Sequence, residues 1–195
     1  MQEAKKLFEK LKIVSLLDLA LLLPSSYSNT LLSDTIEIGK KQTFEAKVTE
    51  VTNSSNGKLR ISFYLPKFNR YLSSMLFRVT PYHRQLYRVG SQHFIQGRVE
   101  EYNGNLQINQ AKSLKKIGEI IPKYSTVIKE SAIRALIEKY VTESSLYGEG
   151  LESREVSILM GLHYPTTINQ IENYNQDVLK FIEAFNHMKK LKGKK

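Results

Sequence analysis

Apolar residues recur at every second position between residues 42 and 111, in five short runs that turn signals separate. In the first run Phe44, Ala46 and Val48 alternate with charged or polar residues, which is the pattern of a half-buried strand. Asn-Gly and Asn-Gly-Asn sequences at 56–57 and 103–105 indicate tight turns. We predict five strands, over residues 42–51, 58–65, 71–79, 92–102 and 106–111.

A short insertion separates the third strand from the fourth. Residues 81–88 begin with a proline and fit one or two helical turns. Five strands in about 75 residues, with a helical insertion at this point, favour an OB-type barrel that closes on itself and leaves no free sheet edge. An SH3-like barrel is the alternative.

The segments on either side of the barrel have helical spacing. Residues 2–23 carry leucines at helix-like intervals up to Pro24, and Ser15 with Asp18 fits the cap of a short helix. Residues 24–29 form a polar, helix-breaking stretch. Helical periodicity returns after Pro122 and lasts to a lysine-rich end that includes Lys194 and Lys195. We therefore predict an α+β chain with three parts, namely an N-terminal helical segment (1–34), an OB-fold domain (35–118) and a C-terminal helical segment (119–195).

Charge is distributed unevenly along the chain. The net charge is +10, yet no Asp or Glu occurs from Val51 to Val99, where a typical sequence would hold roughly five or six. Such a field of one sign is typical of nucleic-acid-binding surfaces. The side chains that we expect to contact the DNA backbone are Lys58, Arg60, Arg70, Arg78, Arg84, Arg88 and Arg98.

Aromatic residues lie among these cations, and rings beside cations can stack on bases. Those at predicted strand positions are expected in the core, namely Phe63, Phe77 and Phe94. Those that alternate with them or lie in the insertion are expected at the surface, namely Tyr64, Tyr71, Tyr82 and Tyr87. The charge and the barrel together favour nucleic-acid binding. A protein-interaction module of OB or SH3-like type that binds acidic or Pro-rich peptides is the alternative.

Motifs of catalysis and of membrane insertion are absent from the sequence. There is no phosphate-binding Gly-Lys loop, no nucleophile elbow and no His-Glu-x-x-His pattern, and none of the four His has a second ligand at metal-binding spacing. The chain has no Cys, and it shows neither a secretory leader nor an apolar run that could span a bilayer. We expect a cytoplasmic, non-catalytic chain with no membrane partner, no metal site and no cofactor of its own.

Four short motifs resemble, in order, those of the RecG branched-DNA helicases. Residues 11–19 with Pro24 and Tyr27 are similar to that family's opening motif, and 75–77 with Pro81-Tyr82 and Gly90 and Gly97 are similar to its wedge barrel. Residues 121–124 and 162–165 with 179–183 are similar to the segments between the barrel and the motor. The chain departs from the pattern at Arg78, where the family usually has Asn, and one extra residue precedes Pro81.

The resemblance implies a non-catalytic wedge that lies at the branch of a replication fork or Holliday junction and splits strands in recombination and repair. An aromatic ring on the wedge stacks on the first unpaired base, and the matching residue is Phe77, with Tyr82 as the second candidate. The resemblance further implies branched DNA and the single-stranded-DNA-binding protein as partners, and a monomeric chain. The helicase motifs are missing from this sequence, so ATP and Mg²⁺ are expected only in motor domains that would follow it.

Overall fold

The computed structural model describes residues 2–53 and 57–192 and divides the chain into two compact units. One unit is the barrel, residues 30–119, and the other combines residues 1–29 with residues 120–195. The structure thus joins the two predicted helical segments in a single unit instead of leaving them as separate parts. The predicted turn at 53–57 includes residues 54–56, and the predicted lysine-rich end includes Lys194 and Lys195, all of which lie outside the described residues.

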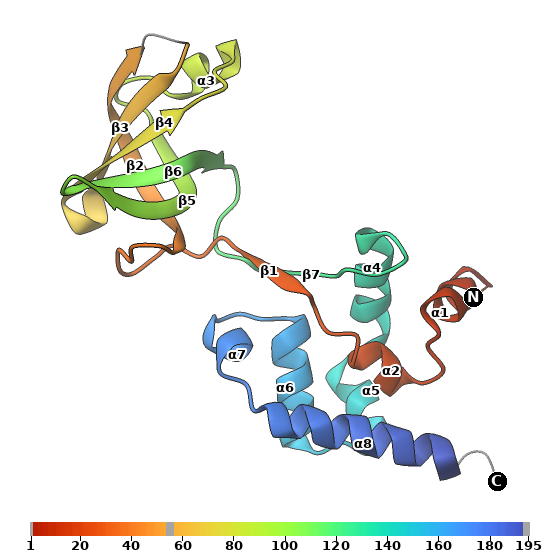
Figure 1. Cartoon of the computed structure of the whole chain (residues 1–195). Helices are drawn as coiled ribbons and strands as arrows, with labels where there is room; N and C mark the ends of the chain where they lie inside the picture. The colour runs from red at the N-terminus through yellow and green to blue at the C-terminus, as the bar shows by residue number, and fades with distance from the viewer. Residues whose placement is uncertain (1, 54–56, 193–195) are drawn as a thin grey trace. The chain divides into compact units, whose positions relative to one another are not determined.

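The described residues of the barrel unit form five strands and two short helices, whose arrangement Figure 1 shows. The elements are β2 (Lys41–Asn53), β3 (Leu59–Leu65), the 3₁₀ turn η1 (Pro66–Phe68), β4 (Arg70–Leu76), α3 (Pro81–Leu86), β5 (Gln92–Tyr102) and β6 (Asn105–Leu114). Neighbouring strands follow the closed order β2–β3–β4–β6–β5. Each neighbouring pair of strands is antiparallel except β4 and β6, which are parallel.

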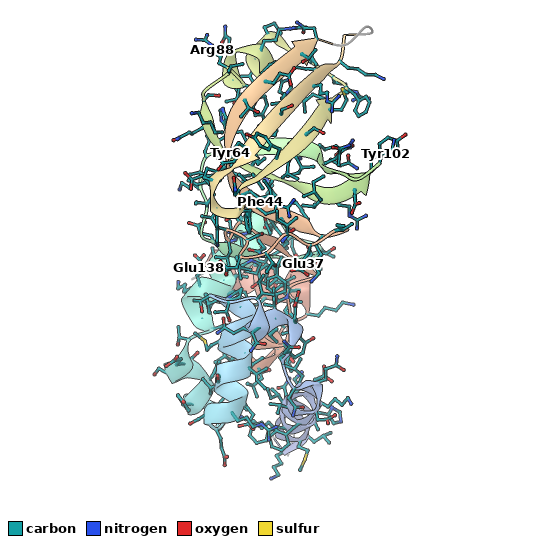
Figure 2. The ribbon with its side chains drawn as sticks, turned by 90° about the vertical axis from the view of Figure 1, so that its left-hand side faces the viewer. Glu37, Phe44, Tyr64, Arg88, Tyr102 and Glu138 are labelled. Carbon is teal, nitrogen blue, oxygen red and sulfur yellow. The ribbon has the colours of Figure 1, made fainter. Side chains whose placement is uncertain are left out.

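In each strand of the barrel every second side chain faces inward, and these side chains form the core. Phe44, Ile61 and Phe63 are fully buried, and Ile95 and Ile108 meet them from β5 and β6. Figure 2 shows Phe44 inside the barrel. A closed five-stranded barrel with a helix between its third and fourth strands confirms the predicted α+β class and OB-type fold.

The third predicted strand is shorter than expected. β4 ends at Leu76, and residues 77–80 form a bend that leads to Pro81 at the first turn of α3. Proline is favoured at that helical position because the first N–H groups of a helix have no internal partner. Phe77 therefore lies just beyond the ladder. The buried residues of β4 are Leu72 and Ser74, so Phe77 also has the parity of the outward-facing side chains, such as Tyr71.

The second unit is built mainly from helices around one apolar core. Leu17, Ile133, Leu159 and Ile182 are buried in it and come from four different helices. No helix among the described residues is both long and apolar enough to cross a membrane. The helices are α1 (Gln2–Leu11), α2 (Leu16–Ala20), α4 (Glu130–Tyr140), α5 (Glu143–Gly148), α6 (Ser153–His163), α7 (Asn169–Glu172) and α8 (Gln176–Lys192).

A two-stranded antiparallel ribbon in this unit was not predicted. β1 (Ser26–Asn29) pairs with β7 (Ile120–Lys123), so the interpretation of residues 24–29 as a polar breaker was wrong. The Tyr27 hydroxyl donates to the Leu162 carbonyl at 2.9 Å and fixes the ribbon to α6. Burial raises the pKa of Tyr27 to about 12, which keeps the hydroxyl protonated and able to donate.

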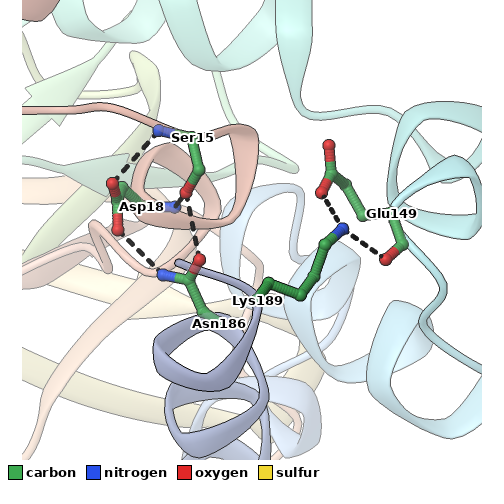
Figure 3. A network of polar contacts seen from close by, with 5 residues as sticks. All are labelled: Ser15, Asp18, Glu149, Asn186 and Lys189. Atoms are coloured by element: carbon green, nitrogen blue, oxygen red, sulfur yellow. Dashed lines mark hydrogen bonds and ion pairs between the residues drawn. The ribbon is translucent and has the colours of Figure 1, made fainter. Parts of the chain in front are cut away.

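A polar network joins the start of α2 to α8 (Figure 3). Ser15 and Asp18 form the predicted capping box, in which the Asp18 N–H donates to Ser15 Oγ at 3.0 Å. Asn186 Nδ2 donates to Asp18 Oδ1 at 2.8 Å, and the Lys190 ammonium forms an ion pair with the same oxygen. Nearby, Lys189 donates to the Glu149 carbonyl at 2.8 Å.

We expect Asp18 to make the stability of the helical unit depend on pH. Partial burial alone would raise the pKa of Asp18, but bonds from Lys190, the Val14 N–H and Asn186 outweigh burial and lower it to about 2. Because the folded pKa lies below the unfolded value of about 3.9, this stabilisation is complete above about pH 5 and is lost as the pH falls toward 2. The difference corresponds to about 2.5 kcal/mol at neutral pH.

Urea unfolding of Asp18→Asn and of the unmodified chain at pH 6 and at pH 2 tests this expectation. The free energy of unfolding should differ by about 2 kcal/mol at pH 6 and by much less at pH 2. Asp34→Asn is the matched control, because the ion pair of Asp34 with Lys67 is exposed and exposed pairs contribute little. A difference between Asp18→Asn and the unmodified chain that is the same at both pH values would contradict the assignment.

Candidate nucleic-acid interface

One end of the barrel presents an aromatic ring covered by a cation. Leu59 pairs with Leu76 at the ends of β3 and β4, which places the flanking residues Lys58 and Phe77 beside each other. Lys58 Nζ lies 5.0 Å from the centroid of the Phe77 ring, within the range of a cation–π contact. Phe77 is 63% exposed, so the expectation that it belongs to the core was wrong.

Helix α3 carries the second predicted ring. The Thr80 N–H donates to His83 Nδ1 at 3.1 Å and caps the helix start. Tyr82 lies in the first turn and is 58% exposed, as expected. The Arg84 guanidinium donates to the Asn53 side chain at the end of β2. Because Asn53 pairs with Leu59, this bond attaches α3 to the same end of the barrel as Phe77.

Tyr87 anchors the end of α3 in the barrel core. It is buried, its ring lies edge-on to Phe63 with 5.8 Å between centroids, and its hydroxyl donates to the Ala111 carbonyl at 3.5 Å. Burial raises the pKa of this hydroxyl. The expectation that Tyr87 lies at the surface was therefore wrong, and its role is to hold α3, with Tyr82 and Arg84, against the barrel.

The seven predicted phosphate-contacting cations fall into three places. Lys58 covers the Phe77 ring, Arg78 follows Phe77 in the chain, and Arg84 lies on α3. Arg88 lies beyond the end of α3 and is labelled in Figure 2. Arg60 and Arg70 lie on β3 and β4, and Arg98 lies on β5 opposite Lys41 of β2. In the described part of the chain none of the seven forms an ion pair, whereas Lys67 pairs with Asp34. Their charges are available to an anionic ligand.

The outer face of β3 and β4 carries two further rings. Tyr64 and Tyr71 are directly opposite each other in the ladder, with ring centroids 5.2 Å apart, and Tyr71 is largely exposed. Tyr64 is half-buried and its hydroxyl donates to Asn69 Oδ1 at 3.2 Å. Phe63, on the opposite side of β3, is buried as expected, and Phe94 is half-buried.

The titratable groups of the described residues include no metal-binding cluster. Over residues 2–53 and 57–192, no group of three or more His, Asp or Glu could hold a metal ion. His163 is a buried packing residue, with Nε2 donating to the Ala20 carbonyl at 2.7 Å and Nδ1 2.8 Å from the Tyr124 hydroxyl. Burial lowers the pKa of His163, which favours the neutral ring that these two bonds require.

The strand order and the position of α3 define the class of the barrel as OB-type, and its surface is basic with exposed rings at one end. Comparison with known proteins finds two curated relatives of the chain. The chain is 27% identical over 206 aligned residues to the ATP-dependent DNA helicase RecG of Helicobacter pylori strain 26695, and 26% identical to that of strain J99. These alignments cover the whole chain and confirm the predicted resemblance to RecG.

The chain spans one third of the length of these curated relatives. No protein-family model matches it. Among solved structures, RecG bound to a three-way DNA junction matches 91% of this chain and 28% of its own, with 22% identity and a TM-score of 0.45.

Proposed function

We propose that this chain is the DNA-binding wedge part of a RecG-type helicase, which recognises branched DNA in recombination and repair and is itself non-catalytic. The observation that carries the proposal is Phe77, an exposed ring beneath a lysine, in the stretch from Val51 to Val99 that contains no Asp or Glu. Similarity to RecG along the whole chain supports it.

The chemistry of the barrel end suits a branch point. A base at a fork loses a stacking partner when its pair is opened, and an exposed aromatic ring can replace that partner because a rigid ring loses little entropy. Phe77 supplies such a ring, and Tyr82 supplies a second one from α3. Arg78, Arg84 and Arg88 neutralise the phosphates on either side, which is an interaction without sequence preference.

Phe77→Ala and Tyr82→Ala should each reduce the preference for branched over linear DNA by about tenfold, as expected for the loss of one stacked base. Affinity for linear duplex should change little, because the arginines remain. Both rings are largely exposed, so melting temperatures should stay close to that of the unmodified chain. Fluorescence anisotropy with a three-way junction and a matched duplex measures the preference.

Tyr147→Ala, in α5 of the other unit, is the matched control for removal of an exposed ring. Phe77→Ala and Tyr82→Ala could both keep the ratio of junction to duplex affinity that the unmodified chain and Tyr147→Ala show. In that case neither Phe77 nor Tyr82 is the stacking ring.

ATP and Mg²⁺ belong, in this proposal, to motor domains outside this sequence. The chain lacks a phosphate-binding loop, so we expect no saturable ATP binding by calorimetry and no DNA-stimulated phosphate release. Either signal from the purified chain would contradict this expectation. The proposal also includes the single-stranded-DNA-binding protein as a protein partner, a monomeric chain and a cytoplasmic location.

A further inference from the structure

The chain enters and leaves the barrel through the β1–β7 ribbon. It passes between the two units at two places, between residues 29 and 30 and between residues 119 and 120. Asn29 ends β1, Ile120 begins β7, and these two residues pair with each other. Both connections to the barrel therefore leave the same end of the ribbon, and the contacts that hold the ribbon on the helices determine how much free chain connects the barrel to them.

Two tyrosine hydroxyls hold the other end of the ribbon on the end of α6. Tyr27 donates to the Leu162 carbonyl at 2.9 Å. The hydroxyl of Tyr124, which directly follows β7, lies 2.8 Å from Nδ1 of His163. The two rings are stacked, with 6.0 Å between their centroids. Because Tyr124 and His163 are both buried, their bond is shielded from water while the ribbon stays in place.

The two hydrogen bonds of His163 require its neutral ring. The Ala20 carbonyl can only accept, so Nε2, 2.7 Å away, carries a proton and donates it. Nδ1 of the neutral ring then accepts from the Tyr124 hydroxyl. A second proton, on Nδ1, would turn that acceptor into a donor. The buried Tyr124 hydroxyl would then have no acceptor for its own proton among the described residues.

The surroundings of His163 do not stabilise a positive charge. In the described part of the chain His163 forms no ion pair, and the Asp18 carboxylate of α2 is already paired with Lys190. Burial lowers the pKa of His163, although the bond to Ala20 acts in the opposite direction. The other titratable or charged side chains that interact with His163 or with Tyr124 are Tyr27, Tyr164, Arg134 and Glu138.

We propose that His163 is a proton-sensitive latch, which holds the β1–β7 ribbon on α6 while its ring is neutral and releases the ribbon when the ring takes up a proton. Release is a local opening, because the apolar core of the unit is formed by helical residues such as Leu17, Ile133 and Leu159, which lie outside the ribbon. It lengthens the free chain that connects the barrel to the helices. The proposal is independent of what the barrel binds.

The open ribbon is favoured at acid pH. With the ribbon closed, the pKa of His163 lies below the ordinary value of 6.5, so the closed state binds fewer protons than the open one. The closed ribbon is therefore most stable above about pH 6.5 and loses stability as the pH falls. Between pH 7.5 and pH 5.5 the equilibrium should shift toward the open ribbon by about tenfold.

Amide hydrogen exchange of the whole chain, followed by NMR at pH 7.5 and at pH 5.5, tests the latch. The protection factors of β1 and β7 amides, corrected for the intrinsic effect of pH on exchange, should be about tenfold lower at pH 5.5. At both pH values they should be lower than those of α4 and unchanged by 1 M urea, because a local opening exposes little surface.

His163→Gln should remove the pH dependence, because its amide can donate to Ala20 and accept from Tyr124 without titrating. His187→Gln, which replaces an exposed His of α8, is the matched control and should keep the pH dependence. Tyr124→Phe retains His163 and removes its hydroxyl partner, so ribbon protection should already be about fivefold lower at pH 7.5. This variant decides the question if His163→Gln does not fold.

Three results would each overturn the latch. The first is ribbon protection in the unmodified chain that is the same at pH 7.5 and pH 5.5. The second is ribbon exchange that depends on urea as steeply as that of α4, which would make His163 a stabilising core residue and nothing more. The third is a Tyr124→Phe variant whose ribbon is protected as well as that of the unmodified chain.

Discussion

Replacing Arg78, Arg84 and Arg88 together by Ala should weaken binding to every DNA by on the order of a hundredfold at 0.1 M salt. Each arginine that neutralises a phosphate releases counterions, so three lost contacts should also flatten the slope of log affinity against log salt by roughly 2 to 3. The loss should be similar for junction, duplex and single strand, because phosphate contacts carry no sequence or branch information. Titrations at three or more salt concentrations measure both quantities.

The matched control removes the same charge from the helical unit, through Lys129→Ala, Lys139→Ala and Arg154→Ala in one chain. These side chains are exposed, and the change in net charge equals that of the test variant. If long-range charge alone governs binding, both triple variants should lose affinity equally. Equal losses, or an effect confined to one base sequence, would contradict phosphate contacts at this end of the barrel.

Gly97→Ala should destabilise the barrel by about 3 kcal/mol or more, because a β-carbon there has no room. An added Cβ would lie 2.5 Å from the Asn109 carbonyl oxygen and 2.7 Å from Cγ1 of the buried Ile108. Gly97 lies where the register between β5 and β6 shifts, so both obstacles belong to the packed wall of the barrel. A loss of this size lowers the melting temperature of a domain of about 90 residues by roughly 10–20 °C.

Gly148→Ala is the matched control, since a Cβ at that position in α5 meets nothing within 4 Å. Alanine is the better helix former, so this variant should be neutral or slightly more stable. Thermal unfolding by circular dichroism compares the two. A melting temperature for Gly97→Ala within two or three degrees of the unmodified chain would show that β5 and β6 separate more easily than the structure indicates.

The barrel could be predicted from the sequence because its signal is local. Each strand buries alternate residues, so Phe44, Ile61 and Ile108 mark their own strands without reference to the rest of the chain. The helical insertion was equally visible, since Pro81 opens it. The ribbon of β1 and β7 was not, because its partners are far apart in sequence, with Ser25 and Lys123 separated by 98 positions.

The burial of individual rings did not follow from residue type. Phe77 was expected in the core because an aromatic residue at a strand position is usually buried, but the inward residues of β4 are Leu72 and Ser74, which gives Phe77 the outward parity. Tyr87 was expected at the surface, yet the end of α3 turns it onto Phe63.

The most direct test of the wedge proposal compares the unmodified chain on a three-way junction, a matched duplex and a matched single strand, each at two salt concentrations. The account predicts tightest binding to the junction, a preference over duplex that persists at the higher salt, and a steep loss of affinity with salt for all three DNAs. A module that binds acidic or Pro-rich peptides would instead show a shallow salt dependence and no preference among the DNAs. Equal affinity for junction and duplex at both salt concentrations would contradict the account.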